Sequence, residues 1–347
     1  MRYIISALLT STAPLVLAPV VLAPTLLATA AQAEVPKVVT DIPPVHSIVA
    51  AVMGDLGQPV LLLDKGASEH HFQLRPSQAA QLSEAGLVVY VGPTLTPWLA
   101  APLASLGNGA AQLELLAVPG THLQDYGATS EDHDGHDHAE EAGHDDHDHD
   151  AEADQAGHAD HDHEGHDDHE DHDHTGTDPH AWLDPANGKL WAGAVAAELA
   201  RLDPEHAATY AANAAALTAA IDAADAAATA TLTPVKDRPF AGFHDAYGYF
   251  AGHYGLAMAG AVSLGDATTP GAKHMADLKA KVSAGKILCL FPEAQHDPAL
   301  LEQLAEGTGV RIGGALDPVG ATMEPGPTLY SDLLTGTAGT LAECLGQ

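Results

Sequence analysis

The chain has 347 residues, a formal net charge of −34 at pH 7, 46% hydrophobic residues and only two cysteines. Such a charge argues against nucleic acid and anionic membrane surfaces as partners, and it favours cations. The length is sufficient for two folded domains, each with its own hydrophobic core.

The N-terminal segment, residues 1–33, has the pattern of a signal peptide. Arg2 provides a short positive region, an apolar stretch follows, and Ala31-Gln32-Ala33 forms a small-x-small cleavage site. Prolines interrupt the apolar stretch, which argues against a stable membrane-spanning helix. No cysteine stands near the cleavage site for lipid attachment. We therefore expect an exported protein in a Gram-negative periplasm, without a direct membrane anchor.

The first half of the mature chain alternates short apolar segments with helical patterns. Strands are predicted at residues 38–40, 60–63 and 87–91, and helices at residues 47–53, 76–84 and 98–106. The strands are continuously apolar and are separated by glycine, proline and aspartate. This pattern is typical of a parallel sheet that helices cover on both faces.

A histidine-rich acidic tract spans residues 131–174. It holds 13 histidines and 20 acidic residues, with no Lys or Arg. This composition buries too little apolar surface to offset the entropy of ordering, so the tract is predicted to be disordered. A solubilising acidic linker would explain the carboxylates but not the imidazoles, which are the commonest side-chain metal ligands. We therefore expect accessory metal capture by His133, His136, His138, His144, His147, His149, His158, His161, His163, His166, His169, His172 and His174.

A long helix is predicted to begin at Pro204 and to end near Leu232. This stretch contains no glycine, and 15 of the 24 residues from Ala207 to Ala230 are alanine. Asp203 is a suitable N-cap, and proline suits the first turn. A helix of this length spans roughly 40 Å, which is long enough to join two lobes. The residues at helical spacing along one of its faces are Tyr210, Asn213, Leu217 and Ile221.

The second half repeats the alternation of strands and helices. Strands are predicted at residues 240–243, 257–264, 287–291 and 310–312, and helices at residues 245–254, 270–285, 297–306 and 328–345. The predicted fold is therefore α/β, with two lobes that each hold a mainly parallel sheet flanked by helices, joined by one long rigid helix. The predicted domains after the signal peptide are an N-terminal lobe at 34–185, a helical segment at 186–235 and a C-terminal lobe at 236–347.

The two cysteines, Cys289 and Cys344, are predicted to form a disulfide. An isolated pair in an oxidising compartment usually forms a structural disulfide. Zinc ligation by the two thiolates is the rival interpretation, and it is disfavoured because neither cysteine has a nearby CxxC partner.

Three histidines outside the tract, His70, His180 and His244, stand where predicted strands end. In open α/β sheets, ligands bind beyond the carboxyl ends of the strands. Two facing lobes would bring these positions to one cleft. Each histidine alone could be a structural residue, but their joint placement favours a metal site between the lobes.

Several motifs around these histidines carry a resemblance to a known family. They are Pro44-Val45-His46-Ser47-Ile48-Val49, Gly66-Ala67-Ser68-Glu69-His70, Leu74-Arg75-Pro76-Ser77, Asp178-Pro179-His180-Ala181-Trp182-Leu183-Asp184-Pro185, Phe243-His244-Asp245-Ala246-Tyr247-Gly248-Tyr249-Phe250 and Leu316-Asp317-Pro318. In these motifs the chain resembles the periplasmic zinc-binding proteins of ABC uptake transporters. The resemblance covers essentially the whole mature chain, and it implies one metal ion in the cleft between the lobes, with His70, His180 and His244 as ligands.

The resemblance leaves the fourth ligand open. Glu69 matches a glutamate next to the first ligand in some zinc members, others leave the position to water, and Asp317 matches an aspartate ligand of manganese and iron relatives. Three imidazoles with at most one carboxylate suit tetrahedral Zn²⁺, whereas Mn²⁺ favours more oxygen ligands. We expect His71 to be exposed. Structural or surface roles are expected for His46, His206, His253, His274 and His296.

The resulting functional prediction is capture of Zn²⁺ in the periplasm and its delivery to the membrane permease of an ABC transporter, which works with a cytoplasmic ATPase. The protein is expected to be a monomer, to bind no nucleic acid and to have no enzymatic activity. The alternative is a periplasmic zinc buffer, chaperone or adhesin-type metal protein. A zinc hydrolase is less favoured, because the chain has no His-Glu-x-x-His motif.

Overall fold

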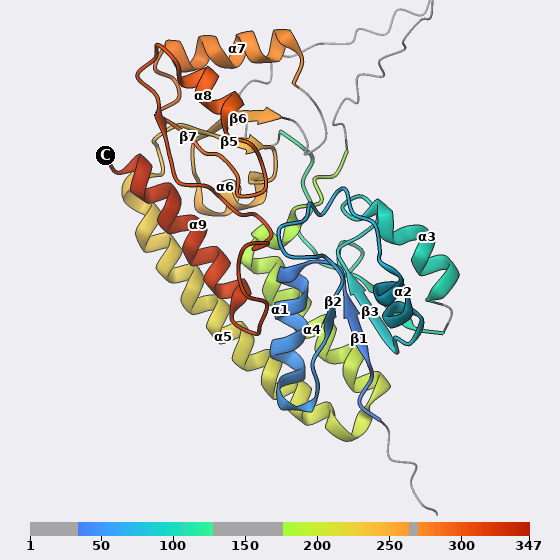
Figure 1. Ribbon diagram of the computed structural model, residues 1–347. Coiled ribbons are helices and arrows are strands. Elements are labelled where there is room, and N and C mark those ends of the chain that lie inside the picture. The colour runs from blue at the N-terminus through green and yellow to red at the C-terminus, as the bar shows by residue number, and fades with distance from the viewer. Residues whose placement is uncertain (1–33, 108, 128–175, 264–269) are drawn as a thin grey trace, which may run out of the picture. The chain divides into compact units, whose positions relative to one another are not determined.

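The computed structural model describes residues 34–107, 109–127, 176–263 and 270–347 (Figure 1). The predicted signal peptide and the histidine-rich tract therefore lie outside the described residues. Within the described ranges, no helix has both the length and the apolar character needed to cross a membrane.

The N-terminal lobe is built on a four-stranded parallel sheet with the strand order β2-β1-β3-β4. The central strands are buried, and three helices accompany the sheet. The elements are β1 (Val38–Thr40), α1 (Pro43–Met53), β2 (Val60–Leu61), α2 (Pro76–Ser83), β3 (Leu87–Tyr90), α3 (Pro97–Leu106) and β4 (Ala111–Glu114).

The C-terminal lobe repeats this arrangement, with a parallel sheet of order β6-β5-β7-β8. Its elements are β5 (Phe240–His244), α6 (Gly248–Tyr254), β6 (Met258–Ser263), α7 (Ala272–Ser283), β7 (Cys289–Leu290), α8 (Ala299–Ala305), β8 (Arg311–Ile312) and α9 (Leu329–Leu345). Two α/β lobes with parallel sheets confirm the predicted fold class.

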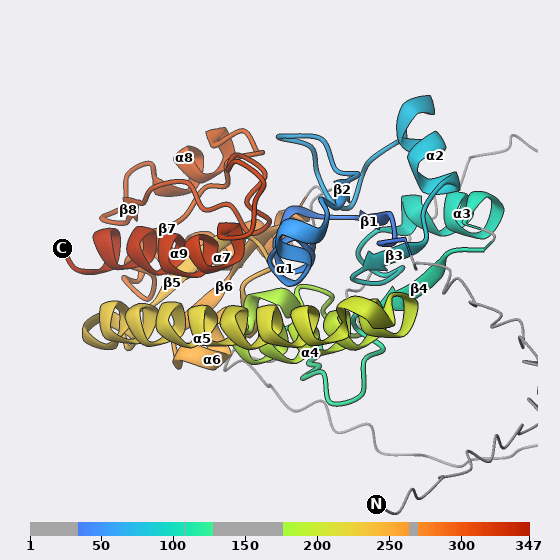
Figure 2. The same ribbon diagram turned by 90° about the horizontal axis from the view of Figure 1, so that it is seen from below.

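Two long helices lie between the lobes in sequence, α4 (Pro185–Leu202) and α5 (Ala207–Leu232). Helix α5 packs against α4 and α1, and α9 runs alongside it (Figures 1 and 2). The buried stripe of α5 is rich in alanine, which allows these close helix contacts. The buried residues of α5 are Tyr210, Ala214, Leu217, Ile221, Ala224, Ala228 and Leu232.

The start of the long helix differs from the prediction. Residues Pro204–His206 form a 3₁₀ turn, and the α-helix begins at Ala207. Asp203 occupies the N-cap position of this turn, as predicted, but its side chain makes no cap hydrogen bond to the backbone. Its Oδ2 instead accepts hydrogen bonds from the His206 ring (2.7 Å) and the Tyr210 hydroxyl (2.8 Å).

Other differences concern the limits of elements. Helix α1 begins at Pro43 rather than residue 47, because a proline at its first position is favourable. Helix α6 begins at Gly248 rather than residue 245, because residues 245–247 form a turn after β5. Strand β4 was not predicted, since its sequence Ala-Gln-Leu-Glu is short and half polar.

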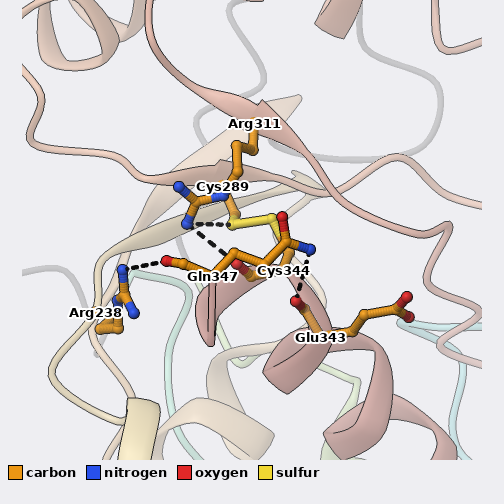
Figure 3. Close-up of a disulfide and its surroundings, with 6 residues drawn as sticks. All are labelled: Arg238, Cys289, Arg311, Glu343, Cys344 and Gln347. Atoms are coloured by element: carbon orange, nitrogen blue, oxygen red, sulfur yellow. Dashed lines mark hydrogen bonds between the residues drawn. A yellow bond between two sulfur atoms is a disulfide. The ribbon is translucent and has the colours of Figure 1, made fainter.

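The predicted disulfide between Cys289 and Cys344 is confirmed (Figure 3). It ties β7 to the C-terminal end of α9, and both cysteines are buried. The Arg311 guanidinium from β8 donates to the backbone oxygen of Cys344 over 3.1 Å. Because both sulfur atoms are joined in the disulfide, the rival interpretation of two zinc-ligating thiolates is excluded.

Removal of this disulfide should destabilise the protein. Its cysteines are 55 residues apart, and closing a loop of that length contributes about 4 kcal/mol in the chain-entropy model. The double variant Cys289→Ser/Cys344→Ser should lose about this free energy of unfolding in guanidinium denaturation. Reductant should lower the stability of the unmodified chain and leave the variant unaffected. An unchanged unfolding midpoint in the variant would contradict the expectation.

Candidate metal centre

His70, His180 and His244 converge on one point in the structure. The Nε2 atom of His180 lies 3.3 Å from that of His70 and 3.4 Å from that of His244. Two nitrogens that each lie about 2.05 Å from a tetrahedral zinc ion are about 3.3 Å apart. Both Nε2–Nε2 distances from His180 therefore match the separation of two ligand atoms in a zinc tetrahedron.

The three histidines reach this point from different parts of the fold. His70 lies in the loop between β2 and α2, His180 directly precedes a 3₁₀ turn at Ala181–Leu183, and His244 is the last residue of β5. His244 thus belongs to the strand, whereas the sequence analysis placed it just after. His180 and His244 are buried, and the His70 side chain is 15% exposed, so the point of convergence is reached from one side.

Glu69 joins the three histidines as a fourth donor. Its carboxylate and the three imidazoles each offer one ligand atom, and these four atoms lie within 4.8 Å of one another. The Glu69 side chain is buried, and Oε1 is 4.0 Å from His70 Nε2. The Trp98 indole donates to the Glu69 backbone oxygen over 2.7 Å, which holds the loop that carries both residues.

Asp317, the other candidate for the fourth ligand, is engaged elsewhere. Its Oδ1 accepts the Ala321 amide (2.8 Å), and its Oδ2 accepts the amide and the hydroxyl of Thr322 (2.9 and 2.7 Å). Among the described residues, Asp317 belongs to no cluster of metal-ligand atoms. The structure therefore brings Glu69, and not Asp317, to the three histidines.

Two buried carboxylates accept hydrogen bonds from two of the candidate ligand imidazoles. Asp178 Oδ1 accepts the Nδ1–H of His180 over 2.7 Å, and Glu293 Oε2 accepts that of His244 over 2.6 Å. Each bond fixes the ring tautomer that leaves Nε2 as an acceptor toward the metal, and it raises the basicity of that nitrogen. Burial, and to a lesser extent the charge of Asp178, raises the pKa of nearby Asp245.

The sequence analysis did not identify these supporting carboxylates. Asp178 lies two residues before His180, inside a motif that was already singled out, and this proximity was an available signal. Glu293 follows β7, the neighbour of β5 in the sheet, and only the strand order reveals that it faces His244.

A second cluster adjoins the first. His244, Glu293 and His296 also have ligand atoms within 4.8 Å of one another. The His296 ring stacks on Phe243 with a centroid distance of 4.4 Å, and its Nε2 is 3.7 Å from Glu293 Oε2. His296, which was assigned a structural or surface role, therefore lies beside the metal centre.

The other histidines in the described ranges belong to neither cluster. His71 is exposed, as predicted. His46 is buried in α1, where loss of hydration lowers its pKa. His253 contacts Asp184 and Asp225 over 3.2 and 2.9 Å, and these carboxylates raise its pKa.

Comparison with known proteins agrees with this architecture. Residues 38–344 match a family described as "Zinc-uptake complex component A periplasmic". The chain is 49% identical over 316 residues to the high-affinity zinc uptake system protein ZnuA of Paracoccus denitrificans, which covers 91% of this chain and 94% of the relative. It is 37% identical to the protein of that name in Brucella suis, with 89% and 92% covered.

Solved structures share the fold at lower identity. A structure titled "Crystal structure of ZnuA" has a TM-score of 0.66 at 23% identity, covering 89% of this chain and 98% of that chain. The manganese complex of FpvC from Pseudomonas aeruginosa has a TM-score of 0.69 at 19% identity, covering 90% and 99%. The family match spans nearly all of the chain after the predicted signal peptide, and the chain belongs to the family of periplasmic components A of zinc-uptake complexes.

Proposed function

We propose that this chain captures Zn²⁺ in the periplasm and delivers it to the permease of an ABC transporter, which works with a cytoplasmic ATPase. The observation that carries the proposal is the spacing of the three Nε2 atoms, 3.3 and 3.4 Å, beside a buried carboxylate. The relatives named as zinc uptake proteins support the same cargo. Export by the N-terminal signal peptide and action as a monomer are part of the proposal.

The family membership excludes the alternative of a zinc hydrolase. The family consists of solute-binding transport proteins, so the chain is not an enzyme. The metal is accordingly cargo that has to be released, not a resident cofactor.

The proposed ligands are His70, His180, His244 and Glu69. Three neutral imidazoles and one carboxylate form the borderline-soft donor set that favours Zn²⁺ over Mn²⁺. Glu69 is the better fourth ligand than Asp317, because its carboxylate lies with the three imidazoles, whereas the Asp317 carboxylate accepts three hydrogen bonds from Ala321 and Thr322. The same fold also occurs in manganese complexes, so the donor set and not the fold carries the preference for zinc.

Metal selectivity and the ligand set can be tested together. In competition with a chelator of known affinity, the unmodified chain should bind one Zn²⁺ far more tightly than Mn²⁺. His70→Ala, His180→Ala and His244→Ala should each weaken this site by more than about 100-fold, because a lost ligand costs more than a lost supporting residue. His206→Ala is the matched control and should leave the affinity unchanged, since His206 bonds Asp203. Equal or preferential binding of Mn²⁺ would rule out the zinc assignment.

The supporting carboxylates give a second test. Asp178→Asn and Glu293→Gln should each weaken zinc binding roughly 10- to 100-fold, because the neutral amide no longer holds the imidazole tautomer or its basicity. Glu302→Gln, an exposed change of the same kind in α8, should have no effect on the affinity measured by the same competition. Wild-type affinity in Glu293→Gln would show that its hydrogen bond to His244 does not tune the ligand.

We further propose that the histidine-rich tract is an accessory collector of zinc. Its last histidine, His174, is six residues before the ligand His180. A coil of the tract's length would have a root-mean-square reach of roughly 35–40 Å. Histidines at that range can raise the zinc concentration at the centre, while each binding event must order the chain and is therefore weak.

Deletion of residues 131–174 tests this division of labour. Calorimetric titration of the shortened chain should lose the weaker zinc equivalents and retain one tight site with nearly unchanged affinity. Uptake should decline mainly when zinc is scarce, because the collector then matters most. Loss of the tight site on deletion would mean that the tract supplies a primary ligand.

A further inference from the structure

The segments on either side of the tract are paired with each other. Asp125 and Thr177 form an antiparallel bridge, the Tyr126 amide donates to the Gly176 oxygen (3.2 Å), and the Asp178 amide donates to the Gln124 oxygen (2.9 Å). We call residues 124–127 and 176–178 the stem. The stem ends at Asp178, two residues before the ligand His180.

Asp178 joins the stem to the metal centre. Its Oδ1 accepts both the backbone amide and the Nδ1–H of His180, over 2.9 and 2.7 Å. Its Oδ2 accepts the Gln124 side-chain amide over 3.4 Å. Because Asp178 is only 1% exposed, its position is set by these contacts and not by water. Any shift of the Asp178 backbone is therefore passed on to the His180 ring.

The Asp178 backbone is held from the C-terminal lobe by Tyr249. The Tyr249 hydroxyl donates a hydrogen bond to the backbone oxygen of Asp178 over 2.8 Å and accepts one from the backbone amide of Gln124 over 3.0 Å. Tyr249 lies in α6 and is 1% exposed. The preceding residue, Gly248, allows this close approach, because a Cβ there would lie 2.4 Å from the Gln124 side-chain nitrogen.

The same unit of the C-terminal lobe carries a metal ligand. Strand β5 ends at His244, and α6 begins four residues later. In the turn between them, Asp245 accepts a backbone hydrogen bond from Gly127, on the other strand of the stem. One short segment thus presents His244 directly and also holds the stem that presents His180.

From this geometry we infer that Tyr249 is a positioning residue of the metal centre: its hydroxyl, acting through Asp178, sets the place of His180 relative to His244. The inference rests on the proposed zinc function. Without the hydroxyl, the Asp178 backbone oxygen would lose a buried hydrogen bond and the Gln124 backbone amide a part-buried one, which leaves the stem free to shift. A tetrahedral site is sensitive to such a shift, since ligand distances must hold to within about 0.2 Å.

The test compares two variants of the full chain that each remove one buried tyrosine hydroxyl, Tyr249→Phe and Tyr210→Phe. Tyr210 is the matched control, because it is 0% exposed and its hydroxyl donates to Asp203 at the start of the long helix. Four quantities are measured. They are the melting temperature without metal, the zinc affinity and the zinc release rate at chelator-buffered zinc that fills only the tight site, and the absorption spectrum of Co²⁺ bound in place of zinc.

Tyr249→Phe should bind zinc about fivefold more weakly, mainly through faster release, because it acts one step behind a supporting carboxylate whose loss costs roughly 10- to 100-fold. Its Co²⁺ spectrum should also change, which reports altered ligand geometry. Tyr210→Phe should lower the melting temperature and leave the zinc affinity, the release rate and the Co²⁺ spectrum unchanged.

Wild-type zinc release and Co²⁺ spectrum in Tyr249→Phe would overturn the inference, whatever the melting temperature. Equal metal effects in both variants would overturn it too, since they would reflect general destabilisation. Failure of the proposed function looks different: the unmodified chain would then bind no zinc tightly, and the inference would fall with it.

Discussion

Three imidazole nitrogens can face one another at 3.3 and 3.4 Å only if the rest of the chain holds their rings in place. Lone pairs directed at one point repel each other, and a cation or shared protons must balance them. The fold meets this requirement with buried carboxylates behind the rings, Asp178 for His180 and Glu293 for His244. The same lone pairs that repel one another attract a divalent cation placed between them.

The two parallel sheets provide the frame for this arrangement. His244 and Glu293 come from β5 and from the end of β7, which are adjacent in the C-terminal sheet. His70 and Glu69 come from the loop after β2 in the N-terminal sheet. Parallel strands place their carboxyl ends at one edge, so both lobes present polar side chains there without exposing their cores. The disulfide of Cys289 fastens β7 itself to α9.

The sequence predicted the features that depend on local pattern. Continuous apolar runs marked most strands, and the alanine-rich stretch marked the long helix. The three histidines stood out because each stands where a strand was expected to end. Features that depend on packing were not predicted: the contact of Glu293 with His244 joins residues 49 apart and requires the strand order. Asp203 had the right place for a cap, but its oxygen is bonded by the ring of His206 and the hydroxyl of Tyr210, which a local rule does not include.

The alanine stripe of α5 has a mechanical consequence for how the ion leaves. Small side chains let α1, α4 and α9 lie close along this helix, so a large rotation of one lobe would strip apolar contacts along its whole length. Wide hinge opening is therefore costly, and we expect the permease to unload the protein by displacing a loop. The segment between β2 and α2 is suited to this role, because it carries His70, the most exposed of the three imidazoles. Release of the ion would then depend on displacement of this loop and not on a wide hinge opening of the two lobes.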